Sequence, residues 1–231
     1  MRKSGLLAGM LLMLAQQPAQ SEPLAVDLEL VLAADTSMSM DADERRLQID
    51  GYASAFRDRN VASAILSGRL RRIAVIYIEW STDQKVVVPW TLLQNQTDIT
   101  KFADAIAQTP AHRSYGGTNL TGAIAFAALS IRSNEFVSAR LAIDISGDGA
   151  NNTTFPPDPV RDQTVEQGIT INGLPLNRLR GDPHDPNAQP TDVYYHDHVI
   201  GGPGAFLVVA NGAHDFVRAI RQKLLREIAA R

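Results

Sequence analysis

Apolar, strand-like runs alternate with helical stretches along most of this 231-residue chain, and this alternation restricts the fold more than any other feature. The first run, Val26 to Ala34, is apolar-rich and stops abruptly at Asp35, as a buried strand does. The stretch from about Ala42 to Arg57 is helical, and Asp41 and Glu44 have the spacing of a capping box at its start. The alternation predicts a doubly wound α/β fold, with helices on both faces of a mainly parallel sheet.

The remaining elements continue the same alternation of strands and helices. Further strands are expected at Ile73–Trp80, Lys85–Trp90, Arg140–Ile145, Ile169–Leu174 and Phe206–Ala210. Further helices are expected at Thr97–Gln108 (capped by Thr97 or Asp98), Asn119–Ile131, Val160–Gln167, Asp192–Val199 and His214–Ala230. Polar residues 81–84 suit a hairpin turn, so one edge strand should be antiparallel. The segment Asn177–Thr191 holds three prolines and is expected to be a long surface loop.

Composition narrows the class of protein. Apolar residues make up 45% of the chain, which is enough to bury the core of a single domain over residues 22–231. The absence of cysteine excludes disulfides, thiolate metal sites and a cysteine nucleophile. A net charge of −3 without a clustered basic face argues against nucleic acid as a partner.

The first 21 residues have the pattern of a signal peptide. Arg2 and Lys3 supply a positive start, and the apolar run Leu6–Ala15 is shorter than the roughly 20 residues that span a bilayer. Cleavage is expected after Ser21 or Ala19; the alternative is an uncleaved hydrophobic tail. No later stretch is long enough to cross a membrane, so an exported protein is expected, periplasmic or secreted, and the lack of cysteine favours a bacterial envelope.

Oxygen-bearing side chains gather where the expected strands end. Asp35, Ser37 and Ser39 follow the first strand, Thr118 precedes a helix, and Asp148 follows the strand at 140–145. In an open α/β sheet, ligands bind at the loops that leave the carboxyl ends of the strands. Two carboxylates and three hydroxyls, without sulfur or imidazole, suit one hard cation, Mg²⁺ or Mn²⁺, rather than zinc or copper.

The spacing of these residues has a physical reason. Ser37 and Ser39 lie two positions apart, so in an extended loop their hydroxyls can point the same way. Gly116 and Gly117 remove side chains where the backbone must approach the site closely. Neutral hydroxyls neutralise a cation incompletely, so the site would keep an electrophilic position open. An acidic side chain from a protein partner is the natural ligand for that position.

Three motifs, in this order, resemble the von Willebrand factor type A domain: Asp-x-Ser-x-Ser at 35–39, Gly-Gly-Thr-Asn-Leu at 116–120, and Asp-Gly at 148–149. Within that family the chain is similar to a secreted bacterial branch labelled as a domain of unknown function. The resemblance, which runs from the first strand to the last helix, implies a non-catalytic, protein-binding domain with a metal-ion-dependent adhesion site.

In such a site, the resemblance implies that Ser37, Ser39 and Thr118 bind the cation directly, and that Asp35 and Asp148 act largely through bound waters. The chain departs from the family at Gly147, where threonine is usual.

A rival interpretation is a Mg²⁺-dependent phosphohydrolase of the haloacid dehalogenase type. Such enzymes also place an Asp after the first strand, and residues 146–152 resemble their Gly-Asp-Gly-x-Asn-Asp loop. Their mechanism needs a second Asp two residues after the nucleophile, as general acid and base. Here that position is Ser37, and the last acid of the loop is replaced by Asn152.

Two further alternatives involve no catalysis. Ser39 or Asp41 caps a helix equally well, Thr118 caps the helix at 119–131, and the dipeptide 148–149 forms an ordinary turn. The run His196-Asp197-His198 could chelate zinc if it were a strand, whereas in a helix residues two apart face different sides.

Overall fold

The computed structural model describes residues 22–111, 116–177 and 189–229. The strands are β1 (Leu24–Ala25), β2 (Glu29–Asp35), β3 (Ile73–Trp80), β4 (Gln84–Leu93), β5 (Phe136–Val137), β6 (Leu141–Gly147), β7 (Ile169–Asn177) and β8 (Ala210–Asn211). The helices are α1 (Ala42–Arg57), α2 (Arg59–Leu66), α3 (Gln96–Ala107), α4 (Leu120–Arg132), α5 (Asp158–Glu166), α6 (Thr191–Tyr194), the π-helix η1 (Tyr195–Val199) and α7 (Ala213–Ala229).

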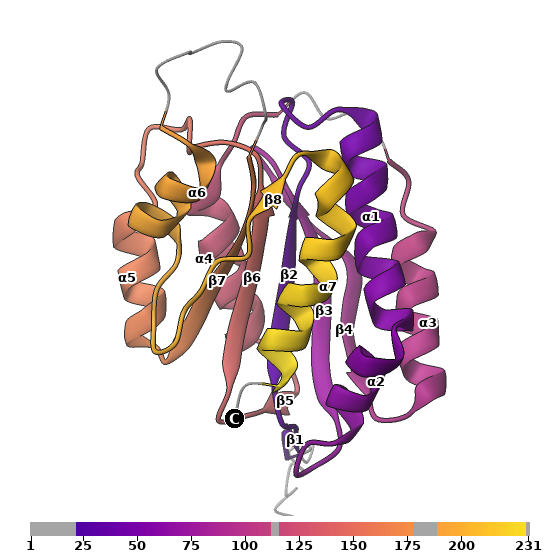
Figure 1. Ribbon diagram of the computed structural model, residues 1–231. Helices are drawn as coiled ribbons and strands as arrows, with labels where there is room; N and C mark the ends of the chain where they lie inside the picture. The colour runs from indigo at the N-terminus through magenta and orange to yellow at the C-terminus, as the bar shows by residue number, and fades with distance from the viewer. Residues whose placement is uncertain (1–21, 112–115, 178–188, 230–231) are drawn as a thin grey trace, which may run out of the picture.

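A six-stranded sheet in the order β4-β3-β2-β6-β7-β8 forms the centre of the molecule (Figure 1). β2 pairs in parallel with both β3 and β6, and β6 pairs in parallel with β7. β4 is antiparallel to β3 and forms one edge of the sheet. The doubly wound sheet with one antiparallel edge strand is therefore confirmed.

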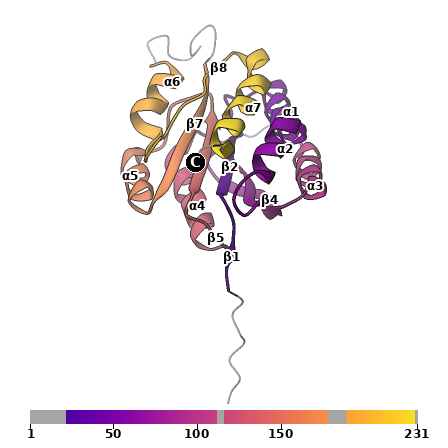
Figure 2. The ribbon, with the colours of Figure 1, turned by 60° about the horizontal axis from the view of Figure 1, so that its bottom comes forward.

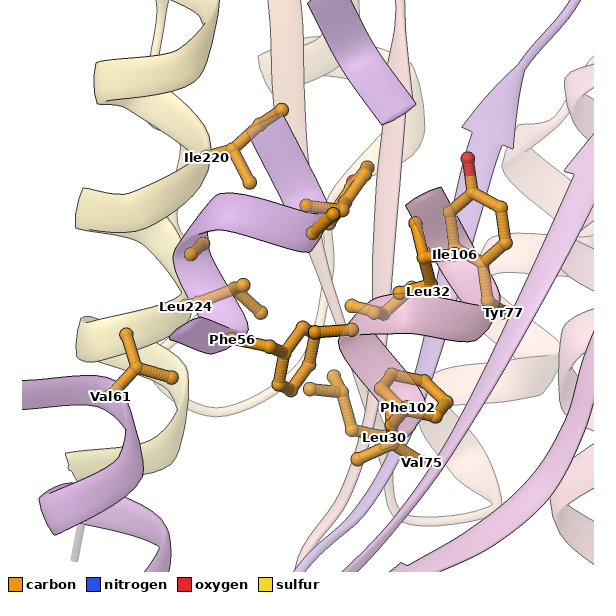
Figure 3. Packing of buried hydrophobic residues seen from close by; sticks show 14 of the residues in the cluster. Leu30, Leu32, Phe56, Val61, Val75, Tyr77, Phe102, Ile106, Ile220 and Leu224 are labelled. Carbon is orange, nitrogen blue, oxygen red and sulfur yellow. The ribbon is translucent and has the colours of Figure 1, made fainter. Parts of the chain in front are cut away.

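Two apolar cores lie on the two faces of this sheet, because alternate residues of each buried strand point to opposite sides. On one face, Leu30 and Leu32 of β2 pack with side chains of α1, α2, α3 and α7. Figure 3 shows Phe56 of α1 and Phe102 of α3 meeting in this cluster, with their ring centroids 4.9 Å apart. On the other face, Val31 and Ala33 of β2 pack with side chains of α4 and η1.

Of the two helix caps predicted at Asp41 and at Thr97 or Asp98, the first is confirmed and the second is wrong. Asp41 and Glu44 form the predicted capping box, in which the Asp41 side chain accepts from Glu44 N and the Glu44 side chain accepts from Asp41 N. The cap of α3 is Asn95, whose side chain accepts from Asp98 N, so the helix starts earlier than the predicted Thr97 or Asp98 cap. An asparagine side chain competes well for this role, and here it precedes both candidates.

Several short elements were not predicted. The helix α2 follows α1 after a single residue, Asp58, which caps it. β1 and β5 pair in parallel at the end of the molecule where the described part of the chain begins (Figure 2). Two-residue strands such as these are too short to leave a periodic pattern in the sequence.

The predicted last strand, Phe206–Ala210, is only partly correct. Within the described residues the regular strand β8 covers Ala210–Asn211, and Leu207 makes an isolated parallel bridge with Gly173. Phe206 N donates instead to the side chain of Asn172, which diverts the backbone from a continuous ladder. The predicted helix at 192–199 is present, but its second half widens into the π-helix η1.

Two expectations fall outside the described residues. These are the signal peptide at 1–21 and the greater part of the expected loop at 177–191, of which 178–188 are not described. None of the described helices is long and apolar enough to cross a membrane.

A buried charged cluster attaches α7 to the sheet. Lys223 Nζ of α7 lies 2.7 Å from Asp144 Oδ1 of β6 and 2.8 Å from Glu227 Oε1, one turn further along α7. Asn172 of β7 also donates to Glu227 Oε1, at 3.0 Å. All of these side chains are buried. Burial, followed by the charge of Glu227, raises the pKa of Asp144 to about 7.

We predict that Lys223→Met destabilises the protein by about 3–5 kcal/mol, because it leaves two buried carboxyl groups without their cation. Urea unfolding measures the change. Lys101→Met is the matched control, since Lys101 lies on α3 and is exposed. Equal losses of stability in the two variants would contradict the role of Lys223.

We also predict that the Asp144 carboxyl makes the stability fall as the pH rises from about 4 to 7. The unfolded chain releases this proton near the ordinary pKa of 3.8, whereas the folded protein holds it until about pH 7. The resulting stabilisation is fully present below the unfolded pKa and is lost as the pH rises through the folded pKa. Asp144→Asn should flatten the profile of unfolding free energy against pH. Parallel profiles for the variant and the wild type would show that Asp144 does not titrate in this range.

Candidate metal centre

The first loop of the candidate site begins at the last residue of β2. Asp35 is fully buried, and its Oδ1 accepts a hydrogen bond from Ser37 N at 2.6 Å. This contact turns the chain sharply after the strand. The hydroxyls of Ser37 and Ser39 then lie 2.9 Å apart, on the same side of the loop.

The third loop meets the first one directly. Ser39 Oγ donates to Asp148 Oδ1 at 2.6 Å, and Asp148 follows β6 immediately. The parallel register between β2 and β6 runs to Ala34 opposite Ser146, so the two strands end side by side. Asp35, Ser37, Ser39 and Asp148, which are far apart in the sequence, therefore form one continuous polar cluster.

The second loop is fixed to both of the others through its backbone. Met38 N donates to Gly116 O at 2.9 Å, which joins the second loop to the first. Thr118 N donates to Asn152 Oδ1 at 2.8 Å, and Asn152 N donates back to Thr118 O at 3.0 Å. Thr118 is buried at this junction.

The amides Asn151 and Asn152 are residues whose role in the site was not predicted. Asn152 holds Thr118, and Asn151 Oδ1 accepts from Leu120 N at the first turn of α4. The sequence offers a signal for them, since they occupy the part of the 146–152 loop where a phosphohydrolase would place its acid. Here the side chains are used to position the neighbouring loop.

The two glycines of the second loop allow close packing of neighbouring polar side chains. A Cβ atom at Gly116 would lie 2.6 Å from Ser81 Oγ, and one at Gly117 would lie 2.7 Å from Asn152 Oδ1. Both distances are shorter than ordinary contacts, so a larger residue would push the loop away. The glycines thus admit the groups that position Thr118, which refines the expectation that they bring the backbone itself to the site.

The electrostatics of the cluster are unbalanced. Burial, followed by the negative charge of Asp148, raises the pKa of Asp35 to about 8, although hydrogen bonds from Ser37 and from the Asp148 backbone lower it in part. The second oxygen of Asp35, Oδ2, is buried and accepts no hydrogen bond. Two carboxyl groups therefore lie close enough to repel each other, and one of their oxygens has no donor.

This arrangement fits a divalent cation. The side chains that the cluster offers are oxygen donors only, and Mg²⁺ and Mn²⁺ prefer such donors. A positive charge among Asp35, Ser37, Ser39 and Asp148 would offset the repulsion between the two carboxylates. Ser39 is exposed, so the cluster is accessible from solvent on one side.

The rival sites receive less support from the geometry. His196 pairs with Asp197 of η1, and His198 pairs with Asp158 of α5, so the two imidazoles contact different carboxylates. Among the described residues, no group of three or more His, Cys, Asp or Glu side chains is arranged to hold a metal ion. At the position where a phosphohydrolase needs its second acid, the Ser37 hydroxyl contacts Ser39.

Asn177, at the end of β7, and the start of α6 are joined to each other beside the third loop. Asn177 and Asp192 exchange two hydrogen bonds, from Asn177 Nδ2 to Asp192 Oδ1 and from Asp192 N to Asn177 Oδ1. Thr191 Oγ1 donates to the backbone carbonyl of Asp148 at 3.1 Å. The start of α6 therefore packs directly against the third loop.

Solved structures share this architecture at low sequence identity. A proximal thread matrix protein from mussel byssus, with a zinc-occupied MIDAS motif, matches with a TM-score of 0.62 and 15% identity over 90% of this chain and 49% of its own. The BatB protein of Bacteroides thetaiotaomicron matches with a TM-score of 0.57 and 18% identity, over 88% of this chain and 100% of its own.

A von Willebrand factor type A protein from Catenulispora acidiphila matches with a TM-score of 0.55 and 11% identity, over 88% of this chain and 43% of its own. The present chain thus spans about half the length of the mussel protein. These likenesses show that the fold is that of a von Willebrand factor type A domain.

Sequence comparison places the chain more narrowly. A search of curated proteins found no match. The model of one family, described as "Protein of unknown function (DUF1194)", matches residues 25–231, which is nearly all of the chain. The chain belongs to this DUF1194 family, and its fold is that of a von Willebrand factor type A domain.

Proposed function

We propose that this protein is an exported, non-catalytic domain that binds a protein partner through one divalent cation. The ligands proposed for the cation are Asp35, Ser37, Ser39, Thr118 and Asp148. The observation that carries the proposal is the chain of contacts from Ser37 through Ser39 to Asp148, beside a buried Asp35 whose Oδ2 has no donor. The MIDAS named for the mussel protein supports a divalent ion at this place in the fold.

Each residue has a defined task in this proposal. The Ser37, Ser39 and Thr118 hydroxyls supply neutral oxygens, and the Asp35 and Asp148 carboxylates supply the negative charge. When bound, the cation supplies an electrophilic position that accepts a carboxylate oxygen. Asn152 keeps Thr118 in place through its two hydrogen bonds, and Gln48 donates to the backbone carbonyl of Asp35 at 2.9 Å.

The surface beside the cluster supports a protein as the partner. Met38, between the two serines, is 59% exposed, and Phe155, after the third loop, is 72% exposed. Large exposed apolar side chains beside a polar centre are typical of protein-binding surfaces. We therefore propose that a partner offers an acidic side chain to the cation and apolar side chains to Met38 and Phe155.

We include export in the proposal because residues 1–21 have the signal-peptide pattern. Bacterial relatives in fold, such as BatB, are consistent with a bacterial setting. The mass of the protein recovered from the periplasm or the medium tests this part. A mature chain beginning after Ala19 or Ser21 is expected, and an intact Met1 chain retained in the cytoplasm would contradict it.

The central prediction is that Mg²⁺ or Mn²⁺ stabilises the purified protein against heat. At about a hundred times its dissociation constant, a bound ion adds about 2.7 kcal/mol. For a domain of this size, this raises Tm by about 5–10 °C. Thermal unfolding in Mg²⁺, Mn²⁺, Zn²⁺ and EDTA measures the shift and ranks the ions.

Ser37→Ala should abolish this shift while leaving the Tm in EDTA nearly unchanged. Thr36→Val is the matched control, because Thr36 lies in the same loop but its hydroxyl donates to Trp80 O, away from the cluster. The site is wrongly placed if Ser37→Ala keeps the full shift, or if Thr36→Val loses it as well.

A further inference from the structure

The hydroxyl of Tyr195 is the least explained polar group near the proposed metal centre. Tyr195 is the first residue of η1, and its side chain is fully buried. Its hydroxyl makes no hydrogen bond, and the same is true of Asp35 Oδ2. A buried hydroxyl without a partner costs about 1–3 kcal/mol, so a phenylalanine would serve the core better if packing were the only role.

The two unpartnered atoms border the same small space above Gly147. A Cβ atom at Gly147 would lie 2.5 Å from Tyr195 Oη and 2.7 Å from Asp35 Oδ2. Any side chain at this position would therefore displace both groups. This is also the position at which the chain lacks the threonine usual in von Willebrand factor type A domains.

A second glycine admits the ring of the same tyrosine. A Cβ atom at Gly173 of β7 would lie 2.9 Å from Tyr195 Cδ1. In the register of β6 and β7, Gly173 lies opposite Ile145, which is two residues before Gly147 on β6. Residues two apart on a strand point to the same face, so Gly173 and Gly147 lie on the same face of the sheet. The ring thus lies along these strands, and its hydroxyl reaches their carboxyl ends.

The backbone of η1 is adapted to this placement. Ile200 N donates to Tyr195 O, five residues apart in the sequence, and this widened turn defines the π-helix. Single π-turns within helices occur frequently at functional sites. Here the turn starts at the residue whose hydroxyl faces Asp35.

The Tyr195 hydroxyl carries a proton that it can donate. It lies close to Asp35 Oδ2, a carboxylate oxygen that accepts no hydrogen bond.

We propose that Tyr195 is a positioning residue of the metal centre, and that its hydroxyl donates to Asp35 Oδ2 when the cation is bound, a hydrogen bond that neither atom makes in the structure described. This inference rests on the proposed function, since it assigns Asp35 to the cation site. Groups that orient metal-binding carboxylates in this way tune the affinity for the ion although they do not touch it. Tyr195 would thus fill the place that Gly147 leaves empty.

The decisive variant is Tyr195→Phe, measured in two ways. Its Mg²⁺ affinity in calorimetry should be about 10–100-fold weaker than that of the wild type. Its Tm in EDTA should be equal to or higher than that of the wild type, because the variant removes a buried hydroxyl without a partner. Tyr77→Phe is the matched control, since the Tyr77 hydroxyl is also buried and unpartnered but belongs to the core on the opposite face.

A second variant approaches the same contact from the strand. Gly147→Ala should displace Tyr195 Oη and Asp35 Oδ2 and weaken Mg²⁺ binding. Gly149→Ala should not, because a Cβ atom there meets nothing within 4 Å. This pair keeps the inference testable if Tyr195→Phe folds poorly.

The outcomes separate the two claims. Normal Mg²⁺ affinity in both Tyr195→Phe and Gly147→Ala, with a wild type that binds the ion, would overturn the role of Tyr195 and leave the metal proposal standing. A wild type that binds no divalent ion would overturn both. Weaker binding in Tyr195→Phe, with normal binding in Tyr77→Phe and a Tm in EDTA no lower than that of the wild type, would support the inference.

Discussion

The parallel pairing of β2 and β6 is the constraint on which the rest of the structure depends. Both strands are almost completely buried and carry few polar side chains, so their register is set by two apolar cores at once. With Ala34 opposite Ser146, the strands end together, and their next residues turn into the loops of the candidate site. A shift of one residue would turn the buried side chains of β2 to the wrong faces and separate Asp35 from Asp148.

Buried polar side chains connect this end of β2 and β6 to the last helix, α7. Ser146 of β6 donates to Gln48 of α1, which in turn donates to the carbonyl of Asp35. Two residues before Ser146 on β6, Asp144 contacts Lys223 of α7. The same strand thus carries a buried polar network below the site and the charged attachment of α7. Such groups add little net stability when they are satisfied, but leaving one unpaired is costly, so they fix the arrangement of the helices.

The sequence predicted the layers and the oxygen cluster because both depend on local patterns. Strand ends and residue spacing are sufficient to bring Asp35, Ser37, Ser39 and Asp148 near one another in a parallel sheet. The roles of Tyr195 and Lys223 could not be predicted in this way. Tyr195 depends on a widened turn and on space left by glycines of two other strands. Lys223 and Glu227 have the spacing of a solvated helix pair, and only the folded sheet shows that they face Asp144.

The proposed cation site is tested most directly by a crystal of the mature domain soaked in Mn²⁺, with anomalous diffraction used to locate the ion. We expect one strong peak among the Ser37, Ser39 and Thr118 hydroxyls, with the Asp35 and Asp148 carboxylates around it. A peak at His196 or His198, or no peak at the ends of β2 and β6 in Mn²⁺ well above millimolar concentration, would contradict the proposed site.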